Sequence, residues 1–196
     1  MKDKTEALKV ISERLKDMPW AICSGTAVEI FTNGKRKGRD IDVIVSGDKM
    51  DEVGKRFNVK PVMETREKEG IKIINDYHIE TKVAGVPVEF IGQIEKFIIH
   101  GEECQPASPE NSRKLFEKVQ KTKYLGVEVF VLPIEETLAQ KLIWNRKGDW
   151  QDEEDIKLLK NHKISYKLLV EAFERWSVSK GKQKELLKRY EVLKRG

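Results

Sequence analysis

The sequence predicts a mixed α/β (α+β) domain over residues 1–132, followed by a helical region over residues 133–196 that packs on it. Before Leu132, short segments alternate between apolar and polar residues or form brief apolar runs, as β-strands do. After Pro133, apolar residues recur at intervals of three and four, which is typical of one helix face. No stretch of flexible-linker composition separates the two parts. We therefore expect a mixed β-sheet flanked by helices, with the C-terminal helices packed against it.

The first sixty residues are expected to alternate between helices and strands. A helix over 3–17 carries apolar residues at helical spacing, and Pro19 lies just beyond its end. The short apolar strand 20–23 continues into Ser24-Gly25-Thr26 and a helix that ends near residues 33–34. A strand over 40–45 and a helix over 50–57 follow.

Residues 59–91 are strand-like throughout. One strand is expected over 71–74, and segments 77–83 and 86–91 are expected to form a β-hairpin around the turn Ala84-Gly85. Residues 101–112, which include two prolines, are expected to form an exposed loop. The remaining expected elements are a helix through Leu115 and Val119, a strand over 127–132, and helices over 134–147, 150–161, 165–177 and 180–194.

The composition restricts the class of protein. The 196 residues are enough to bury a core without disulfides or a structural metal. Cys23 and Cys104 lie far apart and match no zinc-binding spacing, which favours a reducing cytoplasm. No apolar run is long enough to span a membrane, and the N-terminus lacks the features of a signal peptide. The net charge of +5 permits polyanionic partners such as RNA or nucleotides, and a mildly basic solvated surface explains it equally well.

Asp40 and Asp42 are candidate metal ligands. Strand alternation places both on one face with Ile44, about 7 Å apart along the strand, and leaves the other face apolar. Two neighbouring carboxylates repel each other unless a cation neutralises them, and Mg²⁺ is commonly held by one or two carboxylates plus phosphate oxygens. The alternative is that both are edge residues that point into water.

The segment Ser24-Gly25-Thr26 is a candidate phosphate site. A strand that leads into a helix presents free backbone N–H groups and the positive end of the helix dipole. Gly25 lets the chain approach a phosphate without a Cβ in the way. The alternative is an ordinary helix cap formed by Ser24 or Thr26.

Glu89 is an isolated acid in the apolar strand 86–91. A buried acid needs a partner, and a metal shared with Asp40 and Asp42 would supply one. The alternative is a structural pair with a nearby Lys or Arg.

Lys141 is an unusual cation inside the apolar stripe of the expected helix 134–147. It can reach a triphosphate from the helical part of the chain. The alternatives are a snorkelling lysine or an ion pair with Asp152 or Asp155 on the next helix.

Two basic segments are candidates for binding an RNA backbone. One is the loop Lys35 to Arg39 beside the proposed site, and the other is the C-terminal helix 180–194. For the C-terminal helix, the interspersed Glu185 and Glu191 favour a solvated face instead.

Over roughly residues 20 to 160, these segments together resemble the nucleotidyltransferase superfamily typified by DNA polymerase beta, in its minimal form. The family pattern is a Gly-Gly or Gly-Ser pair that opens a helix, an Asp-x-Asp strand and a third acid on a later strand. Ser24-Gly25, Asp40-Ile41-Asp42 and Glu89 match it. The stretches 25–28, 38–43 and 132–156 are most similar to the abortive-infection-toxin-like and uncharacterised branch. Ser24 stands where the family usually has glycine, which would crowd the phosphate slightly.

The resemblance implies transfer of a nucleoside monophosphate (NMP) from a nucleoside triphosphate (NTP) to an acceptor hydroxyl on RNA or tRNA, a small molecule or a protein. It implies a nucleotidyltransferase-type sheet domain and a requirement for Mg²⁺ or Mn²⁺. Asp40, Asp42 and Glu89 would bind metal, and Glu89 would help activate the acceptor. The implied nucleotide-binding residues are Ser24, Gly25, Thr26, Arg39 and Lys141. The alternative is a catalytically inactive nucleotide-binding or toxin–antitoxin interaction protein on the same fold.

Overall fold

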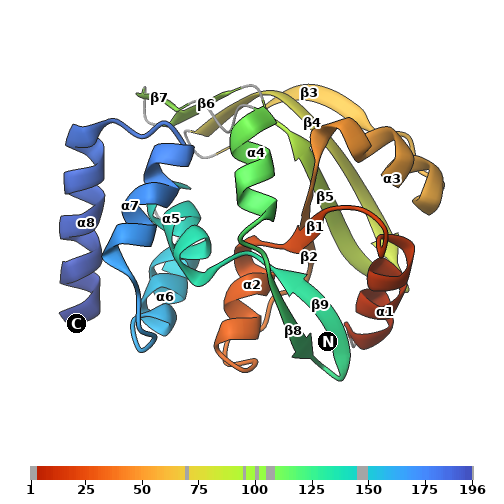
Figure 1. Ribbon diagram of the computed structural model, residues 1–196, viewed down its shortest axis with the longest axis horizontal. Coiled ribbons are helices and arrows are strands. Elements are labelled where there is room, and N and C mark those ends of the chain that lie inside the picture. Colours follow the sequence, from red (N-terminus) through yellow and green to blue (C-terminus); the bar gives the residue numbers. More distant parts are fainter. Residues whose placement is uncertain are drawn as a thin grey trace.

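The structure is a computed structural model that describes residues 4–68, 71–94, 96–99, 102–104, 109–144 and 150–195 (Figure 1). The strands are β1 Trp20–Ile22, β2 Ile41–Val45, β3 Val62–Lys68, β4 Ile71–Val83, β5 Val86–Gln93, β6 Lys96–Ile99, β7 Glu102–Cys104, β8 Gln120–Tyr124 and β9 Val127–Val131. The helices are α1 Thr5–Arg14, α2 Ser24–Phe31, the short 3-10 helix η1 Gly47–Lys49, α3 Met50–Phe57, α4 Pro109–Phe116, α5 Ile134–Trp144, α6 Trp150–Leu159, α7 Tyr166–Arg175 and α8 Lys180–Arg195. The described helices are each too short or too polar to cross a membrane.

The strands form one mixed sheet, as expected. Its order is β7-β6-β4-β5-β2-β1-β9-β8, and β3 pairs with β4 outside that path. The strands β2 and β5 run parallel, and so do β1 and β9, whereas β1 and β2 run antiparallel. The expected hairpin 77–83 with 86–91 is confirmed, because β4 and β5 pair antiparallel across the turn at Ala84-Gly85. Both turn residues have positive φ, as a tight hairpin turn requires.

Several expected boundaries in the middle of the chain are wrong. The segments 71–74 and 77–83 belong to one strand, β4, which pairs with β3 on one side and with β5 and β6 on the other. The polar pair Asn75-Asp76 interrupts the apolar pattern, but Asp76 is fully buried and paired with Arg66. Within the expected loop 101–112, residues 102–104 form β7 and residues from 109 form α4, while 105–108 lie outside the described residues. The strands β6 and β8 were not expected.

The expected helices of the C-terminal part are confirmed in number and position within the described ranges. Helix α5 is described as far as Trp144, so the end expected near residue 147 lies outside the described residues. Helices α6, α7 and α8 begin within one residue of the expected positions. Leu138 and Leu142 of the expected stripe in α5 are completely buried.

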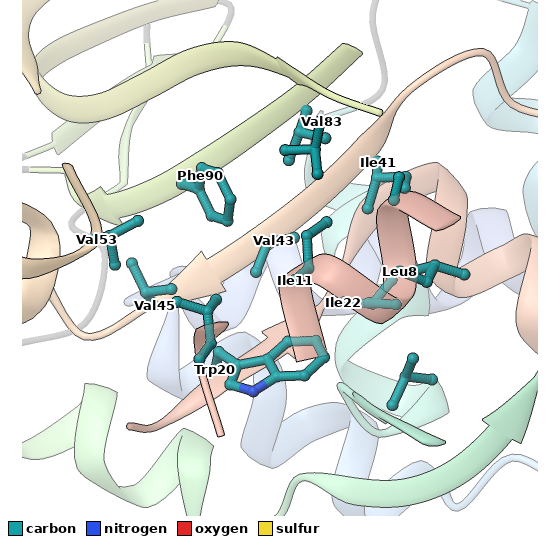
Figure 2. Packing of buried hydrophobic residues seen from close by; sticks show 14 of the residues in the cluster. Leu8, Ile11, Trp20, Ile22, Ile41, Val43, Val45, Val53, Val83 and Phe90 are labelled. Carbon is teal, nitrogen blue, oxygen red and sulfur yellow. The ribbon is translucent and has the colours of Figure 1, made fainter. Parts of the chain in front are cut away.

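One face of the sheet is covered by α1 and α3 (Figures 1 and 2). Ile41, Val43 and Val45 of β2 are each at most 1% exposed on this face. They pack with side chains such as Leu8 and Ile11 from α1 (Figure 2). The alternation of β2 therefore directs Asp42 and Ile44 to the opposite face.

The opposite face packs against the C-terminal helices. A second apolar cluster joins Val28 of α2, Ile71 of β4 and Phe97 of β6 to buried residues of α5, α6, α7 and α8. Figure 1 shows these helices together beside α2, at the end of the molecule away from α1. The helical part is therefore joined to the sheet by a shared core.

Candidate active site

A cleft of about 1320 Å³ lies between the acid-bearing face of the sheet and helices α5 to α7. The residues predicted from the sequence are distributed over four separate segments of the chain. The structure brings seven of the eight to the wall of this cleft: Ser24, Gly25, Arg39, Asp40, Asp42, Glu89 and Lys141.

The carboxylates meet because β2 and β5 are parallel neighbours. Asp42 lies directly opposite Glu89 in the register, and Asp40 precedes β2 at the exposed rim. Burial, followed by the negative charges of Asp40 and Glu89, raises the pKa of Asp42 to about 7. The nearby cations Lys141 and Arg36 oppose this shift without cancelling it. Burial and the neighbouring acids therefore make the ionised form of Asp42 costly in the absence of a bound cation.

Asp40 and Asp42 fit a divalent cation by their chemistry. Both are oxygen ligands of the kind that Mg²⁺ uses, and a cation would offset the repulsion from Asp40 and Glu89 that adds to burial in raising the pKa of Asp42. Within the described ranges, no three or more His, Cys, Asp or Glu side chains are already arranged around a metal position. The remaining ligands would have to come from nucleotide phosphates or from movement of Glu89.

Glu89 is paired with a cation, which was the alternative left open by the sequence. Its Oε1 accepts a hydrogen bond from Arg66 of β3 at 2.7 Å. Arg66 also donates to Asp76 and, at 3.0 Å, to Glu80. The Arg66 guanidinium therefore orients Glu89 at the edge of the cleft.

The start of α2 has an unusual backbone. Ser24 has a φ of +51°, a left-handed conformation that costs free energy for a residue with a side chain. Thr26 is completely buried, and its hydroxyl donates to the backbone carbonyl oxygen of Asp40 at 2.9 Å. Thr26 therefore connects the helix start to the first acid, and it is not among the residues that line the cleft.

Arg36 is a site residue that the sequence analysis missed. Its guanidinium lies against both Gly25 and Gly38, where any Cβ would overlap it. Its Nε donates to Asp155 of α6 at 2.7 Å, and its Nη1 is buried without a hydrogen-bond partner among the described residues. Arg39 is exposed at the rim instead. Charge by itself did not distinguish Arg36 from its basic neighbours in the loop.

Lys141 forms the ion pairs that the sequence analysis had kept as an alternative. Its Nζ lies 2.7 Å from Asp152 and 2.8 Å from Asp155, and all three side chains are less than 10% exposed. Asp155 also accepts from Arg36. Two cations and two acids from the loop, α5 and α6 therefore form a continuous network beside Asp42.

Comparison with known proteins identifies the fold. No family model and no curated protein matches the chain by sequence. A presumed nucleotidyltransferase from Thermotoga maritima has a similar structure, with a TM-score of 0.52, 20% identity, and coverage of 81% of this chain and 93% of that one. The antibiotic-resistance factor ANT(2″)-Ia has a TM-score of 0.52 and 15% identity, and the coverage is 98% of this chain and 97% of that one. The chain has the nucleotidyltransferase fold.

A second network anchors the loop that carries Arg36 and Asp40 in this nucleotidyltransferase fold. Buried Glu29 of α2 accepts hydrogen bonds from Lys4 at 2.6 Å, from the Tyr124 hydroxyl at 2.9 Å and from the backbone N–H of Gly38 at 3.3 Å. Burial and the contact with Glu29 raise the pKa of Tyr124, so its hydroxyl stays protonated and donates.

Tyr124→Phe is expected to lower the free energy of unfolding by about 1.5–3 kcal/mol, because a hydrogen bond to a buried carboxylate is lost. The control is Tyr190→Phe, since the fully buried Tyr190 hydroxyl has no hydrogen-bond partner among the described residues. That control should leave stability unchanged or raise it. Urea unfolding of both variants tests the difference, and equal losses would contradict the assigned role of Tyr124.

Gly25→Ala is expected to destabilise this nucleotidyltransferase fold by about 1–3 kcal/mol, because the new methyl group must displace Arg36 from its place beside Asp155. Gly181→Ala is the matched control, since a Cβ there meets no atom within 4 Å and the residue lies in α8. In a helix, that substitution should be neutral or slightly stabilising. Urea unfolding that showed no loss for Gly25→Ala would contradict the close packing of Arg36.

Proposed function

We propose that this chain is an enzyme that transfers NMP from an NTP to an acceptor hydroxyl with the help of Mg²⁺ or Mn²⁺. The observation that carries the proposal is the pairing of Asp42 with Glu89 across parallel strands, next to Asp40 and facing the start of α2 in one cleft. This arrangement supports phosphoryl chemistry because its carboxylates can hold a metal ion while its basic side chains can hold phosphates.

The phosphates of the NTP would bind at the start of α2. The backbone N–H groups at Ser24 and Gly25 and the helix dipole favour an anion there. Arg36 and Lys141 lie on either side of Asp155 and supply positive charge nearby. Arg39, exposed at the rim, can contact the nucleotide from outside. These groups would position the triphosphate, and Thr26 would hold Asp40 in place.

Asp40 and Asp42 would hold the metal, with Glu89 as a third oxygen ligand. The bound metal would neutralise phosphate charge and polarise the α-phosphate. In the transfer, the acceptor oxygen forms a bond to the α-phosphorus while the bond from that phosphorus to the pyrophosphate oxygen breaks. The hydroxyl proton passes to the Glu89 carboxylate, which Arg66 orients. The products are the nucleotidylated acceptor and pyrophosphate.

Three classes of acceptor are compatible with the proposal, and each can be tested. The basic loop from Lys35 to Arg39 lines the cleft and favours an RNA or tRNA acceptor, because it can contact a phosphate backbone. In α8, Lys182 pairs with Glu185 and Arg189 pairs with Glu153, which supports a solvated face for that helix. The structural similarity to ANT(2″)-Ia, an antibiotic-resistance factor, makes a small molecule such as an aminoglycoside the second class of acceptor. A protein side chain is the third class.

A second candidate function is a catalytically inactive nucleotide-binding or toxin–antitoxin interaction protein. The observation that favours it is that Glu89 and Lys141 already have partners within the chain. In an inactive protein these pairs would persist when nucleotide binds.

Incubation with each α-labelled NTP, Mg²⁺ or Mn²⁺, and total tRNA, aminoglycosides or a protein extract tests the two functions. Labelled acceptor that disappears with Asp42→Ala, but not with Glu13→Ala, supports transfer, since Glu13 is an exposed carboxylate on α1. Nucleotide binding without any labelled product would favour the inactive protein.

A further inference from the structure

Two tryptophans face the cleft from the helical part of the chain. Trp144 is the last described residue of α5 and Trp176 follows α7, and both are half-buried residues of the cleft wall. The buried ring of Phe97 lies between them in the packing, with its centroid 4.7 Å from that of Trp144 and 5.7 Å from that of Trp176. Ile73 and Ile94 extend this apolar wall. The sequence separates these residues too widely to indicate such a platform.

Unpaired polar atoms lie beside the aromatic platform. Gln140 is only 7% exposed, lines the cleft, and its Oε1 has no hydrogen-bond partner among the described residues. Gln140 precedes Trp144 by four residues in α5, so the two side chains share a helix face. Arg175, next to Trp176, donates to Glu136 through Nη2, while its Nε is buried without a partner within the described ranges.

A buried amide oxygen and a buried N–H without partners are costly unless a ligand satisfies them. Aromatic faces next to one such acceptor and one such donor match a planar heteroaromatic ring with a polar edge, which is the chemistry of a nucleobase. The residues proposed to bind the phosphates lie close to this platform along the chain. Lys141 and Trp144 are three residues, or about 4.5 Å of helix rise, apart in α5. One nucleotide can therefore contact both.

We propose that Trp144 and Trp176, supported by Phe97, form the subsite that stacks the base of the donor NTP, with Gln140 and Arg175 contacting the edge of that base. The proposal rests on the proposed function, since it assumes that the phosphates bind near Gly25 and Lys141. It adds a means by which the protein selects among NTPs. Gln140 accepts from an amino or imino group of the base, and Arg175 donates to a ring nitrogen or a carbonyl oxygen.

The test is calorimetric titration of the full chain with each of the four NTPs and with inorganic tripolyphosphate, in Mg²⁺ without acceptor. Trp144→Leu and Trp176→Leu are each expected to raise the Kd for the preferred NTP about tenfold or more and to leave the Kd for tripolyphosphate within about twofold. Trp144→Phe and Trp176→Phe should lose less affinity for the NTP than the Leu variants, because an aromatic ring remains to stack on the base. Gln140→Leu should change the order of preference among the NTPs. The control is Tyr166→Leu, an exposed aromatic residue of α7 outside the cleft wall, and it should bind like the wild type.

Three results would overturn the base subsite. The first is an unchanged NTP Kd in both Leu variants. The second is an unchanged Kd for NTP together with a raised KM for the acceptor when the same variants are measured in the labelled-NTP transfer assay, which would assign the platform to the acceptor and leave the proposed transfer intact. The third is an equal loss of affinity for NTP and for tripolyphosphate in Trp144→Phe, Trp176→Phe and Gln140→Leu. These three variants also test the proposal if Trp144→Leu and Trp176→Leu do not fold. If the wild type binds neither NTP nor tripolyphosphate, the proposed function fails as well.

Discussion

Asp42→Asn is expected to slow NMP transfer by about a hundredfold to a thousandfold, the range found when one preorganised electrostatic contact to a reacting group is removed. The residue lies opposite Glu89 in the sheet register, where burial and the negative charges of Asp40 and Glu89 raise its pKa to about 7. Asn keeps the shape of the side chain but cannot neutralise a divalent cation. The measurement is the rate of transfer from α-labelled NTP at saturating Mg²⁺. A rate within about threefold of the wild type would show that Asp42 does not hold the metal.

The same substitution is expected to stabilise the metal-free protein at high pH. The folded-state pKa of Asp42 is raised from 3.8 to about 7, so between these values the folded protein holds a proton that the unfolded chain has released. Stability therefore falls as the pH rises from about 4 to 7, and above pH 7 the ionised group costs the fold up to about 4 kcal/mol. Asn avoids that cost.

Urea unfolding in EDTA at pH 4.5 and pH 8 tests this expectation. Asp42→Asn should resemble the wild type at pH 4.5 and exceed its free energy of unfolding at pH 8. The control is Glu13→Gln, which replaces an exposed carboxylate and should show no such difference. A variant that loses stability at pH 8 would contradict the cost that burial and the charges of Asp40 and Glu89 place on ionised Asp42.

Asp155→Ala is expected to lower the free energy of unfolding by about 3–5 kcal/mol, because it leaves the largely buried Arg36 guanidinium without its carboxylate and removes one of the two carboxylates paired with Lys141. Asp155 is 2% exposed and pairs with Arg36 at 2.7 Å and with Lys141 at 2.8 Å. Asp152 still pairs with Lys141 in the variant, so the larger share of the loss falls on Arg36. Transfer should also slow, because Arg36 would no longer be held beside Gly25.

The control for Asp155→Ala is Glu174→Ala, which removes an exposed ion pair with Lys180. Exposed pairs contribute at most about 1 kcal/mol, so this variant should unfold much like the wild type. Urea unfolding at pH 7 compares the two. A similar small loss for both would mean that the network around Asp155 does not join α6 to the loop before β2.

Local sequence patterns predicted the elements that carry the site because each pattern reflects a single strand or helix. The alternation over residues 40–45 correctly placed Asp42 away from the core, where Ile41 and Val43 are buried. The apolar spacing of α5 correctly marked Lys141 as a cation in a buried stripe. The strand β4 was divided in two because burial of Asp76 depends on Arg66, which lies on another strand.

The sequence by itself determined the Asp-x-Asp strand, the glycine at the helix start, the acid on the hairpin and the fold class, because these depend on periodicity and backbone preferences within short segments. Only the tertiary structure decided which basic residue of the loop packs against the helix start, since Arg36 differs from its basic neighbours by its contacts with Gly25 and Asp155. It also decided that Glu89 pairs with Arg66 and that Trp144 and Trp176 meet across Phe97. Such pairings join residues far apart in the chain, and their distances are set by the sheet register and helix packing rather than by sequence spacing.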